Sequence, residues 1–254
     1  MNINNKKWAL VTGALGGIGH ALVEEYSRAG YSVLATDVKE ASDSFVGLGN
    51  VHFLQLDLEK IAQSEEFSQR FYNQVQAVTN RESISTLINN AAMQILSPSR
   101  NISREQWQAS FNVNLTAPFF LSQLFLNDLE KTHGSIVNIS SIHATQTKKE
   151  FVAYATTKAA LSSMTRNMVL DLGNKVRINA IEPAAIATEM LKAGFEGKED
   201  KYRQLEAFHP IGRVGTPEEV AKLAVFLSSD DAGFVQGACI SVSGGISGCL
   251  SDPD

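Results

Sequence analysis

The sequence has few of the residues that mark several common protein classes. Only two of its 254 residues are cysteines, Cys239 and Cys249, so neither a disulfide framework nor a cysteine metal site is expected. The five histidines show no ligand spacing such as H-E-x-x-H, which gives a catalytic metal little support. With a net charge of −5 and no basic block, the chain is not expected to bind nucleic acid.

Long apolar runs are also missing. A helix that crosses a bilayer needs about 20 apolar residues, and no run approaches that length, so no membrane association is expected. Residues 1–7 lack the apolar core of a signal peptide and lead into a strand pattern, so we expect a cytoplasmic protein. The hydrophobic content of 44% is enough for a core. Without repeats or linkers, a single domain over residues 1–254 is expected.

Short apolar runs alternate with helical patterns along the whole chain. This alternation predicts an α/β fold with a doubly wound parallel sheet and helices on both faces. A kink or break is expected at Pro118, inside the helical stretch 105–129. Residues 183–210 form the least regular segment, and they are interpreted either as a lid over the substrate or as an ordinary mobile loop. The expected strands are 8–12, 31–36, 51–56, 84–88, 135–139, 176–181 and 238–242. The first expected helix runs from the glycine loop to Ala29, and the others cover 59–79, 105–129, 151–172 and a stretch that begins at Thr216.

A glycine-rich loop, residues 13–19, separates the first expected strand from the first expected helix. Glycines let a backbone approach a pyrophosphate, and the helix N-terminus offers free N–H groups, so this order predicts a dinucleotide site. Asp37 follows the second strand, 18 residues after Gly19. A carboxylate there accepts from the 2′-hydroxyl of NAD and repels the 2′-phosphate of NADP, which favours NAD; Lys39 is the nearby cation that could offset it.

Tyr154 and Lys158 are spaced for proton transfer. Four residues apart on an expected helix, they share one face. A neighbouring ammonium is expected to lower the tyrosine pKa from about 10, so that the phenol can exchange a proton with an alcohol or a carbonyl. Ser141, just after the fifth expected strand, could hold the same oxygen at the ligand edge of the sheet.

Two asparagines, Asn90 and Asn114, are further candidates for the site. Asn90 comes directly after a buried strand, where it either fixes a loop against the ligand or simply forms a turn. Asn114 lies within an expected helix although asparagine is a weak helix former, so it caps, distorts the helix or binds something.

Taken together, these motifs resemble the short-chain dehydrogenase/reductase family of NAD(P)-dependent oxidoreductases, from about residue 6 to residue 245. Thr12, Gly13, Gly17 and Gly19 match the family pattern T-G-x-x-x-G-x-G. The resemblance implies a Rossmann-type sheet in a three-layer α/β/α arrangement. It implies a catalytic group of Asn114, Ser141, Tyr154 and Lys158, and a cofactor site of Gly13, Leu15, Gly17, Ile18, Gly19, Asp37, Asp57, Leu58, Asn90, Ala91, Tyr154, Lys158, Pro183, Ile186 and Thr188.

The resemblance also implies the roles of these residues. Tyr154 would be the general acid/base and Ser141 would orient the substrate oxygen. Lys158 would bind the nicotinamide ribose and lower the Tyr154 pKa, and Asn114 would hold a water that links Lys158 to solvent. Asp57 and Leu58 would flank the adenine, Asn90 would support the central strand, and Thr188 would contact the carboxamide.

Three positions depart from the family pattern. Ala92 and Ala184 stand where the family usually has glycine, and Ser243 where it often has aspartate. Because alanine is more restricted to negative φ than glycine, Ala184 puts a local cofactor contact in question.

The expected function is hydride transfer between NAD(H) and a secondary alcohol or its ketone, with a homo-oligomer, tetramer or dimer, as the expected assembly. One alternative is an NADPH-dependent 3-oxoacyl reductase, which would normally have a basic residue near Leu15 or Gly16. Another is a catalytically silent nucleotide-binding regulatory protein. A third alternative is an epimerase or dehydratase of nucleotide sugars, but such relatives carry a different glycine spacing and an added C-terminal substrate region, for which 254 residues leave little room. Positions expected at the substrate pocket are Gln94, His143, Gln146, Met190 and Phe195.

Overall fold

The computed structural model describes residues 7–41 and 44–250, which form seven parallel strands and the helices around them. The strands lie in one sheet in the order β3-β2-β1-β4-β5-β6-β7. Strands β2 and β3 are therefore added on one side of β1, and strands β4 to β7 on its other side. The strands are β1 (Trp8–Thr12), β2 (Ser32–Asp37), β3 (Val51–Gln55), β4 (Ile84–Asn89), β5 (Ser135–Ile139), β6 (Arg177–Pro183) and β7 (Cys239–Val242). The predicted doubly wound parallel sheet is confirmed.

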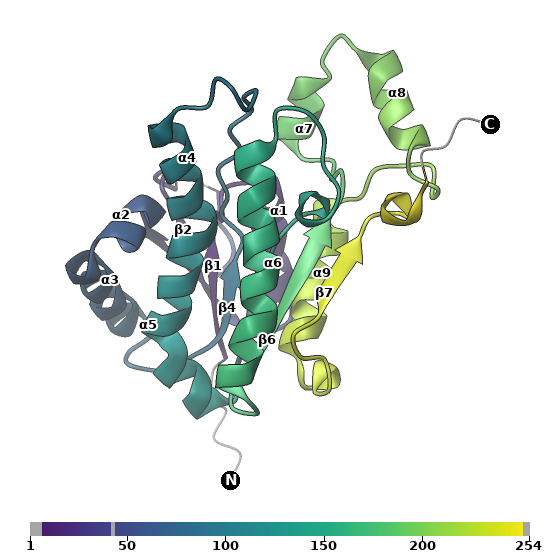
Figure 1. The fold of residues 1–254 in the computed structure, drawn as a ribbon. Helices are drawn as coiled ribbons and strands as arrows, with labels where there is room; N and C mark the ends of the chain where they lie inside the picture. The colour runs from purple at the N-terminus through teal and green to yellow at the C-terminus, as the bar shows by residue number, and fades with distance from the viewer. Residues whose placement is uncertain (1–6, 42–43, 251–254) are drawn as a thin grey trace.

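Helices cover both faces of this sheet (Figure 1). They are α1 (Gly17–Arg28), α2 (Leu58–Gln63), α3 (Glu65–Val78), α4 (Arg104–Phe111), α5 (Ala117–Thr132), α6 (Val152–Leu172), α7 (Glu189–Gly194), α8 (Glu199–Ala207) and α9 (Pro217–Ser228). In β1, Ala9 and Val11 pack with the helices α1 and α9, whereas Trp8 and Leu10 pack with α2, α3 and α5. Because successive strand residues face opposite sides, a strand buried on both faces is apolar throughout.

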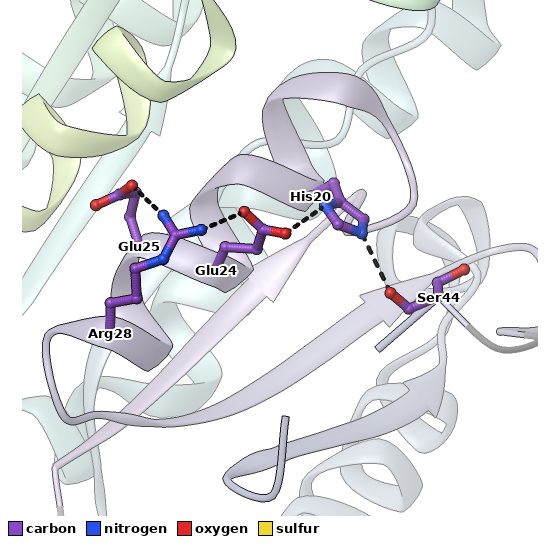
Figure 2. A network of polar contacts seen from close by, with 5 residues as sticks. All are labelled: His20, Glu24, Glu25, Arg28 and Ser44. Carbon is purple, nitrogen blue, oxygen red and sulfur yellow. Dashed lines mark hydrogen bonds and ion pairs between the residues drawn. The ribbon is translucent and has the colours of Figure 1, made fainter. Parts of the chain in front are cut away.

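The solvent side of α1 carries a polar network (Figure 2). Arg28 donates to Glu24 over 2.8 Å and to Glu25 over 2.5 Å. His20 donates from Nε2 to the backbone oxygen of Ser44 over 3.2 Å. The bond between His20 and Ser44 links α1 to the segment that follows β2, whereas the Arg28 contacts lie within α1 itself.

Two predicted helices are interrupted, for different reasons. The stretch predicted as one helix over 59–79 is two, because the side chain of Ser64 accepts from Phe67 N (3.1 Å) and starts α3 afresh. The predicted break at Pro118 is wrong in its position: a π-helical turn, Asn112–Thr116, precedes the proline, and Pro118 lies in the first turn of α5. Proline has no N–H for the carbonyl four residues earlier, that of Asn114, so the ladder is disturbed before the proline itself.

The irregular segment 183–210 contains α7 and α8, which lie beyond the carboxyl ends of β6 and β7 in Figure 1. The side chain of Met190 lies outside the described residues. Across residues 7–41 and 44–250, no helix is both long and apolar enough to span a membrane.

Candidate active site

The glycine loop after β1 is too tightly packed for side chains at three positions. Gly13 has φ +66°, and a Cβ there would lie 2.7 Å from Ala91 Cα. A Cβ on Gly19 would lie 1.9 Å from Gly13 O, and one on Gly17 would lie 2.8 Å from Thr188 Cγ2. The glycines therefore let β1, α1 and the start of α7 meet.

Helix α1 begins without a side-chain cap, in contrast to most of its neighbours. Its N-cap is Gly16, and its first turn carries no acidic residue. The helices α2, α3, α4, α7 and α9 all begin with a side chain that accepts from their first N–H groups. The α1 N-terminus thus keeps its donors and its positive dipole end for an anion, as a bound pyrophosphate requires.

Asp37 lies at the carboxyl end of β2 and faces the glycine loop. Its carboxylate accepts from Leu15 N and from Lys39 N, each over 3.1 Å. The contact with Lys39 is made by the backbone, so the structure gives no ion pair between the two side chains. A fixed carboxylate next to the loop is what the ribose contact needs.

Asn90 joins β4 to the glycine loop. Its side-chain nitrogen donates to Thr12 O (2.9 Å) and Gly13 O (3.1 Å), and Thr12 Oγ1 accepts from the backbone of Asn90 and Ala91 (3.0 and 3.1 Å). Asn90 therefore fixes the loop, rather than merely forming a turn.

Most remaining residues of the predicted cofactor site cap helices, pack in the core or pair between strands. Asp57 caps α2 by accepting from Glu59 N (3.0 Å), and Leu58 is buried in the core. Ile186 is buried in the core between the sheet and the helices α1 and α9, and Ile18 packs against that core. Pro183 pairs with Val242 at the end of β6. Thr188 caps α7 and lies against Gly17.

Tyr154 and Lys158 lie on α6, next to Ser141 at the end of β5. Burial raises the pKa of Tyr154, and a hydrogen bond with Ser141 lowers it in part. The Lys158 ammonium lies 5.6 Å from the Tyr154 ring centroid and donates to Ile139 O over 2.7 Å. Three of the predicted catalytic residues are therefore brought together.

The prediction that Tyr154 has a lowered pKa is wrong in this structure, because burial raises that pKa. Burial also acts on Lys158, whose pKa falls to about 7. A lysine that is only partly protonated at neutral pH presents a weakened positive charge to the phenol. Desolvation therefore outweighs the attraction that the spacing suggested.

Asn114 connects three segments from inside the π-helical turn. Its amide exchanges two hydrogen bonds with the backbone of Met93 (2.7 and 2.9 Å) and donates to Thr157 Oγ1 over 3.0 Å. In the described residues it makes no direct bond to Lys158. Of the roles left open, it occupies the distorted part of the helix and binds the loop after β4.

The three departures fit their surroundings. Neither Ala92 nor Ala184 has a positive φ, so alanine is unstrained at both positions. Ala184 donates to Val242 O over 3.0 Å, and Ser243 pairs with Ser247 (2.9 Å).

Thr12 and Thr157 were missed as site residues by reasoning from the sequence. Both act by accepting hydrogen bonds from an asparagine amide or a backbone N–H. Their positions inside the glycine motif and between Tyr154 and Lys158 were the available signal.

Comparison with known proteins agrees with this geometry. Residues 13–247 match the family model described as enoyl-(acyl carrier protein) reductase. Protein FixR of Bradyrhizobium diazoefficiens is 35% identical over 94% of this chain and 86% of its own. The 3-oxoacyl-[acyl-carrier-protein] reductase FabG of Thermotoga maritima is 34% identical over 94% and 97%. Ligand-free aldohexose dehydrogenase of Thermoplasma acidophilum superposes with a TM-score of 0.87 at 29% identity, covering 98% of each chain. The chain therefore belongs to the short-chain dehydrogenase/reductase family of oxidoreductases.

Proposed function

We propose that this protein transfers a hydride between NAD(H) and a secondary alcohol or its ketone. The observation that carries the proposal is the meeting of Tyr154, Ser141 and Lys158 at the carboxyl edge of the sheet, the same edge at which α1 begins without a side-chain cap. The family supports an oxidoreductase, and the aldohexose dehydrogenase among its relatives acts, by its name, on a hydroxylated substrate.

The residues present fit a dinucleotide. The backbone of the glycine loop and the first turn of α1 would hold the pyrophosphate, Asp37 the adenosine ribose, and Thr188 with Lys158 the nicotinamide half. When bound, this cofactor supplies a hydride donor or acceptor at its nicotinamide ring.

The protein's own part in the reaction is proton transfer and orientation. A raised pKa keeps the Tyr154 phenol protonated at neutral pH, which is the form that donates a proton to a carbonyl oxygen as that oxygen becomes a hydroxyl. Ser141 lies beside the phenol and can hold the same oxygen. Lys158, with a pKa of about 7, can take up and release a proton near neutrality.

The carboxylate of Asp37 supports NAD over NADP. It lies against the glycine loop, where the 2′-phosphate of NADP would meet a negative charge. The loop itself contains no lysine or arginine that would offset this charge.

Replacing the phenol tests the proposal. Tyr154→Phe keeps the ring but removes the proton donor, so turnover is expected to fall by about 10²-fold or more, while NADH binding is unchanged. Turnover is measured by NADH absorbance over a panel of alcohols and ketones, and binding by NADH fluorescence. Equal turnover in the variant and the parent would contradict the acid/base assignment.

The second candidate is a 3-oxoacyl reductase, the activity for which the relative from Thermotoga maritima is named. It predicts consumption of NADPH with a 3-oxoacyl thioester such as acetoacetyl-CoA. The completeness of Ser141, Tyr154 and Lys158 supports an enzyme over a catalytically silent regulatory protein. We also propose that the chain forms a single domain and that its substrate is a small molecule.

A further inference from the structure

His143 is a partly buried histidine next to the proposed acid/base, and the mechanism above does not use it. It follows Ser141 by two residues, and its backbone N–H donates to Ser141 Oγ over 3.2 Å. Its ring meets that of Tyr154 edge-on, with 5.9 Å between centroids and 78° between planes. A side chain in this position borders the place where Tyr154 and Ser141 would hold the substrate oxygen.

The His143 ring is held in one orientation. It stacks on Phe151 with 4.3 Å between centroids and 12° between planes, and its Nδ1 pairs with Thr147 Oγ1 over 3.0 Å. The surrounding loop is braced as well, because Gln146 donates to Ser247 O (2.6 Å) and Glu150 O accepts from Ser97 N (2.9 Å). The ring is therefore a fixed part of the site rather than a mobile surface group.

One nitrogen of this fixed ring remains available. Within the described residues, Nε2 of His143 makes no hydrogen bond, and it is not among the fully enclosed unpaired atoms. Burial and the nearby Lys148 lower the pKa of His143 to about 4, so the imidazole is neutral at pH 7. A neutral imidazole can donate to or accept from a substrate hydroxyl, depending on its tautomer.

We propose that His143 selects substrates that carry a second oxygen on the carbon next to the reacting one, namely vicinal diols and α-hydroxy ketones. This inference rests on the proposed function, because it assigns the reacting oxygen to Tyr154 and Ser141. In such a substrate the second oxygen is bonded to the carbon next to the reacting carbon, and we expect it to lie on the side of the site where the His143 ring borders Tyr154 and Ser141. A substrate with an apolar group there would desolvate the nitrogen without pairing it, and such a site discriminates strongly against the analogue that lacks the hydroxyl.

The experiment compares matched substrate pairs in the intact enzyme. The oxidation pair is 1,2-propanediol and 2-propanol, and the reduction pair is acetoin and 2-butanone. The parent is expected to prefer the oxygenated member of each pair by about tenfold or more in kcat/KM. His143→Phe keeps the aromatic stack but removes the nitrogens, so kcat/KM should fall by about tenfold for the oxygenated member and stay within about threefold for the other.

Two further variants separate recognition from packing. His143→Gln restores a polar group and is expected to regain part of the preference. His52→Phe is the matched control, because His52 also packs on an aromatic ring, that of Trp8, near the start of β3; its substrate preference should equal that of the parent.

Two results would overturn the inference while leaving hydride transfer intact: a parent that turns over both members of each pair equally, or a His143→Phe variant that slows both members by the same factor. Absence of NADH-linked turnover with every alcohol and ketone would instead refute the proposed function, and the inference with it.

Discussion

At the scale of single residues, burial gives Lys158 a pKa near neutrality. Its side chain is 2% exposed, and its pKa falls to about 7. In the unfolded chain the pKa returns to about 10.4, so between these values the unfolded state binds more protons than the folded state. Stability contributed by this group therefore rises with pH over that window, and below pH 7 the charged, buried ammonium destabilises the fold most.

A lysine-to-methionine substitution tests whether the stability contributed by Lys158 rises with pH. Lys158→Met removes the buried charge, so the variant should be more stable than the parent at pH 6, and its advantage should shrink by about 2 kcal/mol by pH 9. Urea unfolding at both pH values gives the two differences in free energy. Tyr154 stays protonated at both, so it contributes equally. A difference that is independent of pH would show that Lys158 titrates normally.

At the same scale, we expect the single carboxylate of Asp37 to set the preference for NAD over NADP. Asp37→Ala removes the charge that would repel a 2′-phosphate and also frees Leu15 N. The ratio of kcat/KM with NAD to that with NADP is expected to fall by about tenfold or more. The two ratios are measured with one alcohol substrate, and a parent that already prefers NADP would refute the assignment of Asp37.

The sequence predicted which residues gather at the site better than it predicted their pKa values and their long-range contacts. The positions of Ser141, Tyr154 and Lys158 follow from strand ends and helix spacing, which are local properties. The direction of the Tyr154 pKa does not, because it depends on desolvation by distant segments. The contacts of Asn114 with Met93 and Thr157 likewise join positions far apart in the chain.

At the scale of elements, the glycine loop holds β1 against α1. A Cβ on Gly19 would overlap Gly13 O, whereas one on Gly16 would lie 3.5 Å from that atom, an ordinary contact. Gly19→Ala is therefore expected to destabilise the fold by about 2–4 kcal/mol or more and to weaken cofactor binding.

Gly16→Ala is the matched control, since it adds the same methyl group three residues earlier. It should fold and unfold like the parent within about 1 kcal/mol. Urea unfolding of the two variants provides the comparison. If both variants matched the parent, close packing around Gly19 would not be important for stability.

Element types were predictable, but some of their limits were not. The strand β1 agrees with its predicted bounds, because an apolar run that stops at glycine leaves little choice. The break at Ser64 required knowing that its hydroxyl would cap a new helix, and the π-helical turn lies ahead of Pro118 because proline affects the carbonyl four residues before it. Helices α7 and α8 are only 6 and 9 residues long, and Gly197 lies between them, so the sequence indicated only irregular structure there.

At the scale of the whole molecule, apolar side chains remain exposed on the outer helices. Phe119 and Phe120 of α5 are each 39% exposed, and Leu170 of α6 is 82% exposed. We propose that these helices join copies of the chain in a dimer or tetramer, since exposed aromatic side chains of this kind are common in interfaces.

A charge introduced on this surface tests the assembly. Phe120→Glu is expected to shift the sedimentation coefficient from that of an oligomer to that of a smaller species, because a carboxylate would be desolvated in the interface. Val46→Glu, at a position 79% exposed on the segment after β2, is the control and should leave the assembly unchanged. A parent that sediments as a monomer would refute the proposal.

The bonds between Asn90 and the glycine loop have a consequence for any attempt to isolate the nucleotide-binding half. A fragment ending after β3 would retain every glycine of the motif together with Asp37, yet it would lack the amide that holds Thr12 and Gly13 in place. Its loop would also lose Ala91, against which Gly13 packs. We therefore expect such a fragment to bind a dinucleotide more weakly than the full chain, because β4 and the residues after it supply contacts that hold the loop in shape.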